Sequence, residues 1–353
     1  MTGYLVLENG EIFEGERLGH NQDVALELVC NEENVGYIES ITDPAYIGKG
    51  IIFEFPLIGN YGIIKEDFES DKVWAKAIFI QEIAEFETNF PKKENFDKYL
   101  REFKVPGLSG VDVKKLAKIV RYEGTMKAYL TSTLNNIDEI MQKIKNYKIE
   151  NPVYEVTSKQ IRTYGRGKTK KIALFDLGLK HGLVNSLLKR DIEVTIYPAN
   201  STFDTILASK PNGIVISNGP GNPLDLKYPI KCIKKLLESN VPILGIGLGH
   251  LSVALAAGFK IEKLEDKHIG INYTVKELKR NRLYVTSQNT EYVVSEESID
   301  KDVVSVSYRN VNDGTIAGLI YKNKNAFTIG FNPEGCPGPL DTSFIFDNFI
   351  KKI

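Results

Sequence analysis

The chain has 353 residues, of which 42% are hydrophobic, and its formal net charge at pH 7 is −1. This length and hydrophobic content suffice for two or three domains with buried cores. The balanced charge excludes a nucleic-acid or membrane surface that depends on bulk charge, and we expect neither kind of partner.

The cysteines and the apolar runs narrow the class of protein further. Cys30, Cys232 and Cys336 form no C-x-x-C pair, so we expect no disulfide framework, no metal site and a reducing cytoplasm. The opening sequence MTGYLVLENGEIFEG shows no pattern of a signal peptide. The uncharged run 241–259 contains a proline, glycines and a histidine, which favours a buried strand and helix over a membrane span.

The first half of the chain predicts a mixed α+β domain over residues 1–150. Asn9-Gly10 between two alternating runs predicts a β-hairpin, and residues 50–62 predict a strand that ends in a loop. Asp112 is a plausible N-cap for a helix that Gly124 would end. A further helix is expected over residues 137–144.

A polar, basic stretch, EVTSKQIRTYGRGKTKK, follows that domain. We assign residues 151–170 as an interdomain linker, although its positive charge could also bind phosphate.

Residues 171–353 change to a rhythm of strand and helix. Apolar strands are predicted at KIALFDLG, IEVTIYP, GIVIS and VPILGIG, with helices between them, which indicates a mostly parallel central sheet. The segments RLYVTSQ, VVSVSYR, IAGLIYK and AFTIGF are strand-rich, and a last helix is expected from about Asp341. The fold class is therefore α/β, with a mixed α+β domain in front of the sheet.

Three glycines, Gly245, Gly247 and Gly249, lie between a predicted strand and a predicted helix. This spacing is typical of a nucleophile elbow, in which the central residue stands at the helix N-terminus. A dinucleotide-binding turn would need a glycine where His250 stands, so that alternative fails. A tight turn without a function is the remaining alternative.

Three segments together resemble the class I glutamine amidotransferases: SNGPGNP (217–223), GIGLGHL (245–251) and NPEGCPGP (332–339). The segments GYIESITDPAYIGKGIIFEFPLIGNYG and GLSGVDVKKLAKIVRYEGTMKAYL are similar to the N-terminal domain of the carbamoyl-phosphate synthetase small-subunit family. The resemblance implies that residues 1–150 form that domain and residues 171–353 a class I amidotransferase-like domain.

The resemblance also identifies where the catalytic triad should lie. In the family a Cys at the elbow attacks glutamine, a His moves the proton and a Glu orients the His. The Cys position is Gly247 and the His position is Asn332, whereas Glu334 matches the family. The resemblance therefore predicts that glutaminase activity is lost.

The family's glutamine pocket is altered as well. Leu251 replaces a Gln, Glu291 replaces a Gly, and Glu33 replaces a Ser that contacts glutamine in the family. The remaining positions carried over to this pocket are Gly219, Gly221, Leu248, Asn289 and Tyr292. We expect no substitute for the missing nucleophile or base from Cys336, His250 or His268. The sequence around His20 and His181 gives no indication of a function.

Two functions follow from these expectations. The first is a small subunit that lacks glutaminase and acts with a large subunit in ammonia-dependent carbamoyl phosphate synthesis, as a cytoplasmic heteromer serving pyrimidine or arginine biosynthesis, with no cofactor of its own. The alternative is a stand-alone pseudo-amidotransferase that binds a small metabolite, with the two added carboxylates favouring a positive ligand.

Overall fold

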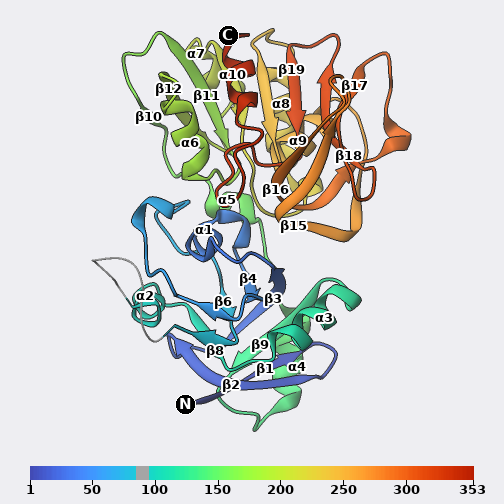
Figure 1. Cartoon of the computed structure of the whole chain (residues 1–353). Helices are drawn as coiled ribbons and strands as arrows, with labels where there is room; N and C mark the ends of the chain where they lie inside the picture. Colours follow the sequence, from blue (N-terminus) through green and yellow to red (C-terminus); the bar gives the residue numbers. More distant parts are fainter. Residues whose placement is uncertain (85–94) are drawn as a thin grey trace. The chain divides into compact units, whose positions relative to one another are not determined.

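The computed structural model describes residues 1–84 and 95–353. It divides into two compact units, Met1–Glu150 and Asn151–Ile353, and each unit is described by itself (Figure 1).

The first unit is built around a closed β-barrel. Its strands, in order around the barrel, are β1 (Thr2–Leu7), β2 (Ile12–Gly19), β8 (Pro106–Ser109), β6 (Ala77–Phe79), β4 (Lys49–Phe53), β3 (Val24–Asn31) and β9 (Met126–Thr131), which pairs back with β1. The predicted hairpin is confirmed, because β1 and β2 pair with Val6 opposite Ile12. Inward-facing residues such as Leu5, Leu26 and Leu108 fill the barrel.

The two helices that the sequence predicts in the first unit are both present. Asp112 accepts a hydrogen bond from the Lys115 backbone N–H at 2.9 Å and caps α3 (Val113–Glu123), which ends at Gly124 with a φ of 85°. The predicted second helix is α4 (Ile137–Asn146). The unit also contains the short helices α1 (Tyr37–Thr42), α2 (Phe96–Glu102), η1 (Pro44–Tyr46) and η2 (Lys65–Asp67).

The strand predicted over residues 50–62 is divided in the structure. β4 ends at Phe53, and a separate short strand, β5 (Leu57–Ile58), pairs with β7 (Glu82–Ile83). Pro56 lies in the break, where its missing N–H cannot take part in a strand ladder.

The second unit contains one ten-stranded sheet. Its strand order is β10 (Arg162–Tyr164), β12 (Ile192–Pro198), β11 (Lys170–Asp176), β13 (Gly213–Ile216), β14 (Ile243–Ile246), β19 (Ala326–Ile329), β18 (Ile316–Tyr321), β16 (Arg282–Val294), β15 (Ile261–Glu277) and β17 (Val304–Asn310). The strands from β12 to β19 run parallel, which confirms the expected parallel centre. The strands from β18 to β17 extend it as an antiparallel sheet.

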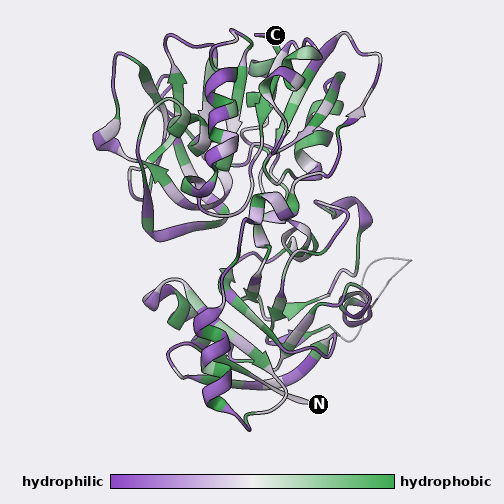
Figure 2. Ribbon diagram, turned by 180° about the vertical axis from the view of Figure 1, so that it is seen from behind, coloured by the Kyte–Doolittle hydropathy of each residue, from purple (hydrophilic) through white to green (hydrophobic). Residues whose placement is uncertain are grey.

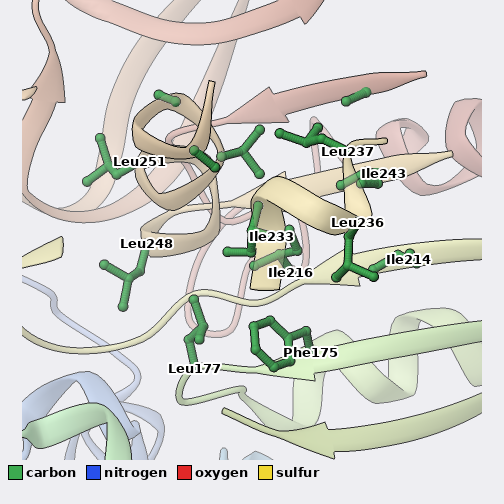
Figure 3. Close-up of a cluster of buried hydrophobic side chains, with 14 of the residues drawn as sticks. Phe175, Leu177, Ile214, Ile216, Ile233, Leu236, Leu237, Ile243, Leu248 and Leu251 are labelled. Atoms are coloured by element: carbon green, nitrogen blue, oxygen red, sulfur yellow. The ribbon is translucent and has the colours of Figure 1, made fainter. Parts of the chain in front are cut away.

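Helices cover both faces of the parallel centre. On one face, α7 (Phe203–Ala208), α8 (Lys227–Leu236) and α9 (Leu248–Ala256) pack against Ala173 and Phe175 of β11. Figure 3 shows Phe175 among the apolar side chains of this face, with Ile233 and Leu236 of α8. On the other face, α6 (His181–Leu188) and α10 (Phe344–Ile350) pack against Ile172 and Leu174. Figure 2 shows the strands as mostly hydrophobic and the connections as mostly hydrophilic. Because both faces are buried, these strands are continuous apolar runs rather than alternating ones.

The stretch predicted as a linker has regular structure in part. It contains α5 (Pro152–Val156) and β10, which pairs antiparallel with β12. The assignment of residues 151–170 as a linker stays a prediction. Two short helices, η3 (Pro223–Asp225) and η4 (Glu296–Ser298), complete this unit's helices among the described residues.

Candidate functional site

The three-glycine segment forms a sharp turn between β14 and α9. Gly247, at its tip, has a φ of 54° and a ψ of −113°. Residues that carry a side chain rarely adopt a positive φ. Any residue other than glycine would therefore be strained at this position. The backbone therefore has the strained geometry that a nucleophile elbow imposes on its central residue.

The glycines on either side of the tip are required by close packing. A Cβ on Gly249 would lie 2.3 Å from the carbonyl oxygen of Ile216, and one on Gly245 would lie 2.9 Å from the carbonyl oxygen of Gly249. Both contacts are with backbone atoms, which cannot move aside as a flexible side chain would. The turn is thus held tightly against the end of the neighbouring strand β13.

The space in front of Gly247 brings together the two residues carried over as nucleophile and base. A Cβ at position 247 would lie 3.2 Å from Cβ of Asn218 and 4.0 Å from Oδ1 of Asn332. Asn332 is fixed there because its backbone N–H donates to the Ser287 carbonyl at 2.9 Å. A side chain at 247 would therefore face residue 332, as the triad geometry requires.

Glu334 lies behind these residues and has a partner that the sequence analysis missed. Its Oε1 lies 3.0 Å from Nζ of Lys180, and both side chains are fully buried. Lys180 also donates to the Cys336 carbonyl at 2.8 Å, and Asn218 Nδ2 lies 3.5 Å from the same carboxylate oxygen. Glu334 therefore neutralises a buried cation, although no histidine stands at 332 for it to orient.

Three buried polar atoms of residues around the elbow have no hydrogen-bond partner among the described residues. They are Oδ1 of Asn218, Oε2 of Glu334 and Nε2 of His250. Buried polar atoms are nearly always hydrogen-bonded, so these three atoms are exceptions to the rule.

The loop 217–221 packs against the elbow through its glycines. A Cβ on Gly219 would lie 2.0 Å from the Leu177 carbonyl oxygen and 3.1 Å from Cδ2 of Leu248. Gly221 has a φ of 89° and contacts Pro152. Leu248 is the first residue of α9, so its N–H has no partner within the helix and is directed towards the N-terminal end.

The carried-over pocket residues of β16 lie on both faces of the strand. Asn289 and Glu291 are two residues apart and therefore lie on the same face. Nδ2 of Asn289 has no partner in the described part of the chain. Glu291 forms an ion pair with Lys267 at 3.3 Å, with both side chains largely buried. This ion pair compensates the charge that Glu291 brings.

A small pocket, partly open to solvent, lies beside the elbow. It is lined by Gly247, His250, Leu251, Thr290, Tyr292 and Gly330, among others. Tyr292 and Leu251 are thus placed together near the tip, whereas Glu33 lies in the first unit, where its Oε2 accepts hydrogen bonds from Asn31 and Ser40.

The histidines of the second unit occupy structural positions. His250 is fully buried and its Nδ1 lies 2.7 Å from Oγ1 of Thr328; burial lowers its pKa to about 4. His268 lies 2.8 Å from Asp313 and 3.2 Å from Asn310. Nε2 of His250 has no partner among the described residues, but the low pKa of this ring disfavours proton uptake near neutral pH.

The cysteines do not supply the missing thiol. Cys336 is half-buried and its Sγ donates to the Glu334 carbonyl, at 3.4 Å. Burial raises the pKa of Cys232 to about 11, which keeps it protonated. Residues 1–84 and 95–353 hold no group of three or more His, Cys, Asp or Glu side chains that could bind a metal ion. Within the same ranges, no helix combines the length and the apolar character that a membrane span needs.

Comparison with known proteins gives matches over most of the chain. The family described as "Carbamoyl-phosphate synthase small chain, CPSase domain" matches residues 5–130, and "Glutamine amidotransferase class-I" matches residues 173–352. The pyrimidine-specific carbamoyl phosphate synthase small chain of Bacillus subtilis is 41% identical over 355 residues, covering 100% of this chain and 96% of the relative. The carbamoyl phosphate synthase small chain of Lactococcus lactis strain IL1403 is 38% identical over 346 residues, covering 98% and 96%.

Comparison with solved structures gives matches of low sequence identity. A glutamine amidotransferase from Thermotoga maritima is 15% identical, with a TM-score of 0.38, over 47% of this chain and 76% of that one.

Proposed function

This chain belongs to the family of carbamoyl-phosphate synthase small chains, and from that premise we propose that it is a small subunit without glutaminase activity. In this proposal it pairs with a large subunit that makes carbamoyl phosphate from free ammonia. The small-chain homologues imply that partner.

One observation carries the proposal. The elbow has a strained backbone, but the residue at its tip is glycine, which has no side chain that could act as a nucleophile. Gly247 has the φ and ψ of a nucleophile position and faces Asn332, an amide that cannot accept a proton near neutral pH. Attack on a carboxamide needs both a nucleophile and a proton acceptor. Removing such groups lowers a rate by several orders of magnitude, and their effects are not additive.

We assign the former glutamine pocket to the carried-over residues and propose that it no longer binds glutamine. Glu291 adds bulk where the family has Gly. Leu251 lacks the amide group of the Gln that the family has at this position. In the second unit the carried-over positions are Gly219, Gly221, Leu248, Leu251, Asn289, Glu291 and Tyr292. Glu33 is carried over by the resemblance in the first unit.

The test is an assay of the chain reconstituted with its large subunit, with ammonium chloride or glutamine as the nitrogen source. We expect carbamoyl phosphate with ammonium chloride and only background with glutamine. Rapid synthesis from glutamine by a sample free of other amidotransferases would contradict the loss of glutaminase. Failure to associate with the large subunit would contradict the subunit role.

A restoration series separates the triad from the pocket. Gly247→Cys alone should give no measurable glutaminase, because residue 332 and the pocket are altered as well. The double variant Gly247→Cys, Asn332→His is the matched comparison. Activity of the single variant would mean that the pocket still binds glutamine.

The alternative of a stand-alone binder of a small metabolite stays a proposal. Glu291 is paired with Lys267 at 3.3 Å, so the charge of this one of the two added carboxylates is compensated within the chain.

A further inference from the structure

The ten-stranded sheet of the second unit has an open edge at β10. At the other end of this sheet, β17 pairs with β15 on one side and with β18 on the other, so that end is closed. Among the described strands, β10 pairs only with β12, in antiparallel register with Thr163 opposite Thr195. One side of β10 is therefore available for a further strand.

The outer side of β10 presents backbone groups to solvent. Along an antiparallel strand the N–H and C=O groups point alternately to the two sides, so part of those in β10 point away from β12. Apart from the pairing with β12, Arg162, Thr163 and Tyr164 form no backbone hydrogen bond with the described residues. The side chains of Ile161 and Tyr164 are 48% and 40% exposed, so no described element of this unit covers the edge.

The chain around this edge is uniformly basic. Residues 157–171 contain no Asp or Glu, and their basic residues are Lys159, Arg162, Arg166, Lys168, Lys170 and Lys171. Ion pairs within the unit compensate Lys168 and Lys171. Arg162 and Arg166 are exposed and have no acidic partner among the described residues. The edge therefore combines unpaired backbone groups with two uncompensated positive charges.

We propose that β10 is a docking site for an extended, acidic segment of a partner protein, which adds to the sheet as a further strand. Backbone hydrogen bonds along the edge supply the affinity of such strand addition. The charges of Arg162 and Arg166 select for carboxylates in the added strand. This inference concerns a surface away from the elbow and does not depend on the proposed function.

A second copy of this chain is a poorer occupant of the same edge. Pairing two copies of β10 would bring the same arginines together, and like charges on paired strands are destabilising. A phosphate-containing ligand would be attracted by the same charges but would gain nothing from an open strand edge. The experiment therefore separates the contribution of charge from that of strand pairing.

The test titrates the full chain with short synthetic peptides, with binding measured by calorimetry. The acidic peptide acetyl-EVTVEVTE-amide should bind, and acetyl-KVTVKVTK-amide should bind at least about tenfold more weakly. The peptide acetyl-EVPVEPTE-amide keeps the same charge, but its prolines lack the N–H groups that a strand ladder needs. It should also bind at least about tenfold more weakly than the first peptide.

Amide hydrogen exchange reports how the acidic peptide binds. Strand addition buries and bonds the outer N–H groups, so saturating acidic peptide should slow exchange in residues 161–165 by at least about tenfold. Inorganic tripolyphosphate and the proline-containing peptide should leave this exchange unchanged.

Arg162→Glu and Lys324→Glu form a matched pair of variants. Each reverses one exposed charge in the same unit, but Lys324 lies in the turn between β18 and β19. Arg162→Glu should weaken binding of the acidic peptide roughly fivefold, whereas Lys324→Glu should leave it unchanged. If Arg162→Glu does not fold, Arg166→Glu replaces it with the same expectation.

Several outcomes would overturn the proposal. No binding of the acidic peptide at about 1 mM, or equal binding of the proline-containing peptide, would exclude strand addition. Equal slowing of exchange by tripolyphosphate would assign the edge to phosphate. Slowed exchange in residues 161–165 on dimerisation of the chain alone would assign it to a second copy, and an unchanged affinity in both arginine variants would remove the charge argument. None of these outcomes involves glutamine, ammonia or the large subunit, so the proposed function keeps its own assay.

Discussion

The backbone of the elbow and the side chains around its tip are constrained by different physical factors. Gly245 and Gly249 are held by contacts with backbone atoms, as close as 2.3 Å for an added Cβ on Gly249, and any larger residue would disturb the sheet. At 247 the nearest atom to an added Cβ is a side-chain carbon, Cβ of Asn218 at 3.2 Å, and the φ of 54° also favours glycine. The two outer glycines are therefore required by backbone packing, whereas residue 247 is constrained mainly by its own backbone conformation.

Glu334 tests this comparison most directly, because the family resemblance assigns it to the triad and it lies in a buried ion pair. Glu334→Gln should lower the free energy of unfolding by about 3 to 5 kcal/mol, since it removes the buried carboxylate that pairs with Lys180. Denaturant unfolding measures this, with Gly330→Ala as a control that touches neither residue. A loss below about 1 kcal/mol would place Glu334 with the dispensable side chains.

His250 should make the elbow region sensitive to acid. Its pKa is lowered from 6.5 to about 4 in the folded chain, so between these values the unfolded state binds the extra proton. Its contribution is therefore fully present above pH 6.5 and falls as the pH decreases towards 4, by roughly 3 kcal/mol in total.

The check on His250 is the difference in unfolding free energy between wild type and His250→Asn from pH 7 to pH 4.5. The variant keeps a polar group for Thr328 and lacks the titration. We expect the wild type to lose more stability over this range. Parallel curves would mean that carboxyl groups elsewhere cause the acid sensitivity.

Gly249→Ala tests the backbone side of the comparison directly. Its methyl group would meet the Ile216 carbonyl at 2.3 Å, so β13 and α9 must separate. We expect a loss of about 2 kcal/mol in the free energy of unfolding, as for other overpacked sites. Gly330→Ala is again the control, and equal stability of the two variants would contradict the packing argument.

The ion pair between Lys267 and Glu291 should give the smallest effect. Both side chains are partly exposed, at 17% and 19%, so screening limits the contribution of the pair. Lys267→Met should cost less than about 1 kcal/mol, measured by denaturant unfolding at low and high salt. A larger, salt-independent loss would place the pair with the structural residues.

Much of the fold could be predicted because its signals are local. The Asn9-Gly10 turn, the Asp112 cap and the Gly124 end each depend on neighbouring residues, and the structure confirms them. The tight turn at Gly247 could be predicted for the same reason. The spacing of the three glycines indicates positions where a Cβ would clash with neighbouring atoms.

Other features were missed because they depend on distant residues. A lone lysine between a strand and a helix is usually at the surface, so nothing local indicates that Lys180 is buried against Glu334. The pairing of β10 with β12 occurs within a polar, basic stretch, where composition alone favours a loop. Lys267 was missed because its partner lies on the adjacent strand.

The closed barrel of the first unit has a consequence for how another protein can recognise it. Each of its strands, from β1 round to β9, is hydrogen-bonded on both sides, so the barrel offers no unpaired strand edge within the described residues. A partner cannot attach there by adding a strand to the sheet. Recognition of the barrel must therefore use side chains and helix surfaces, which makes it sensitive to single surface substitutions.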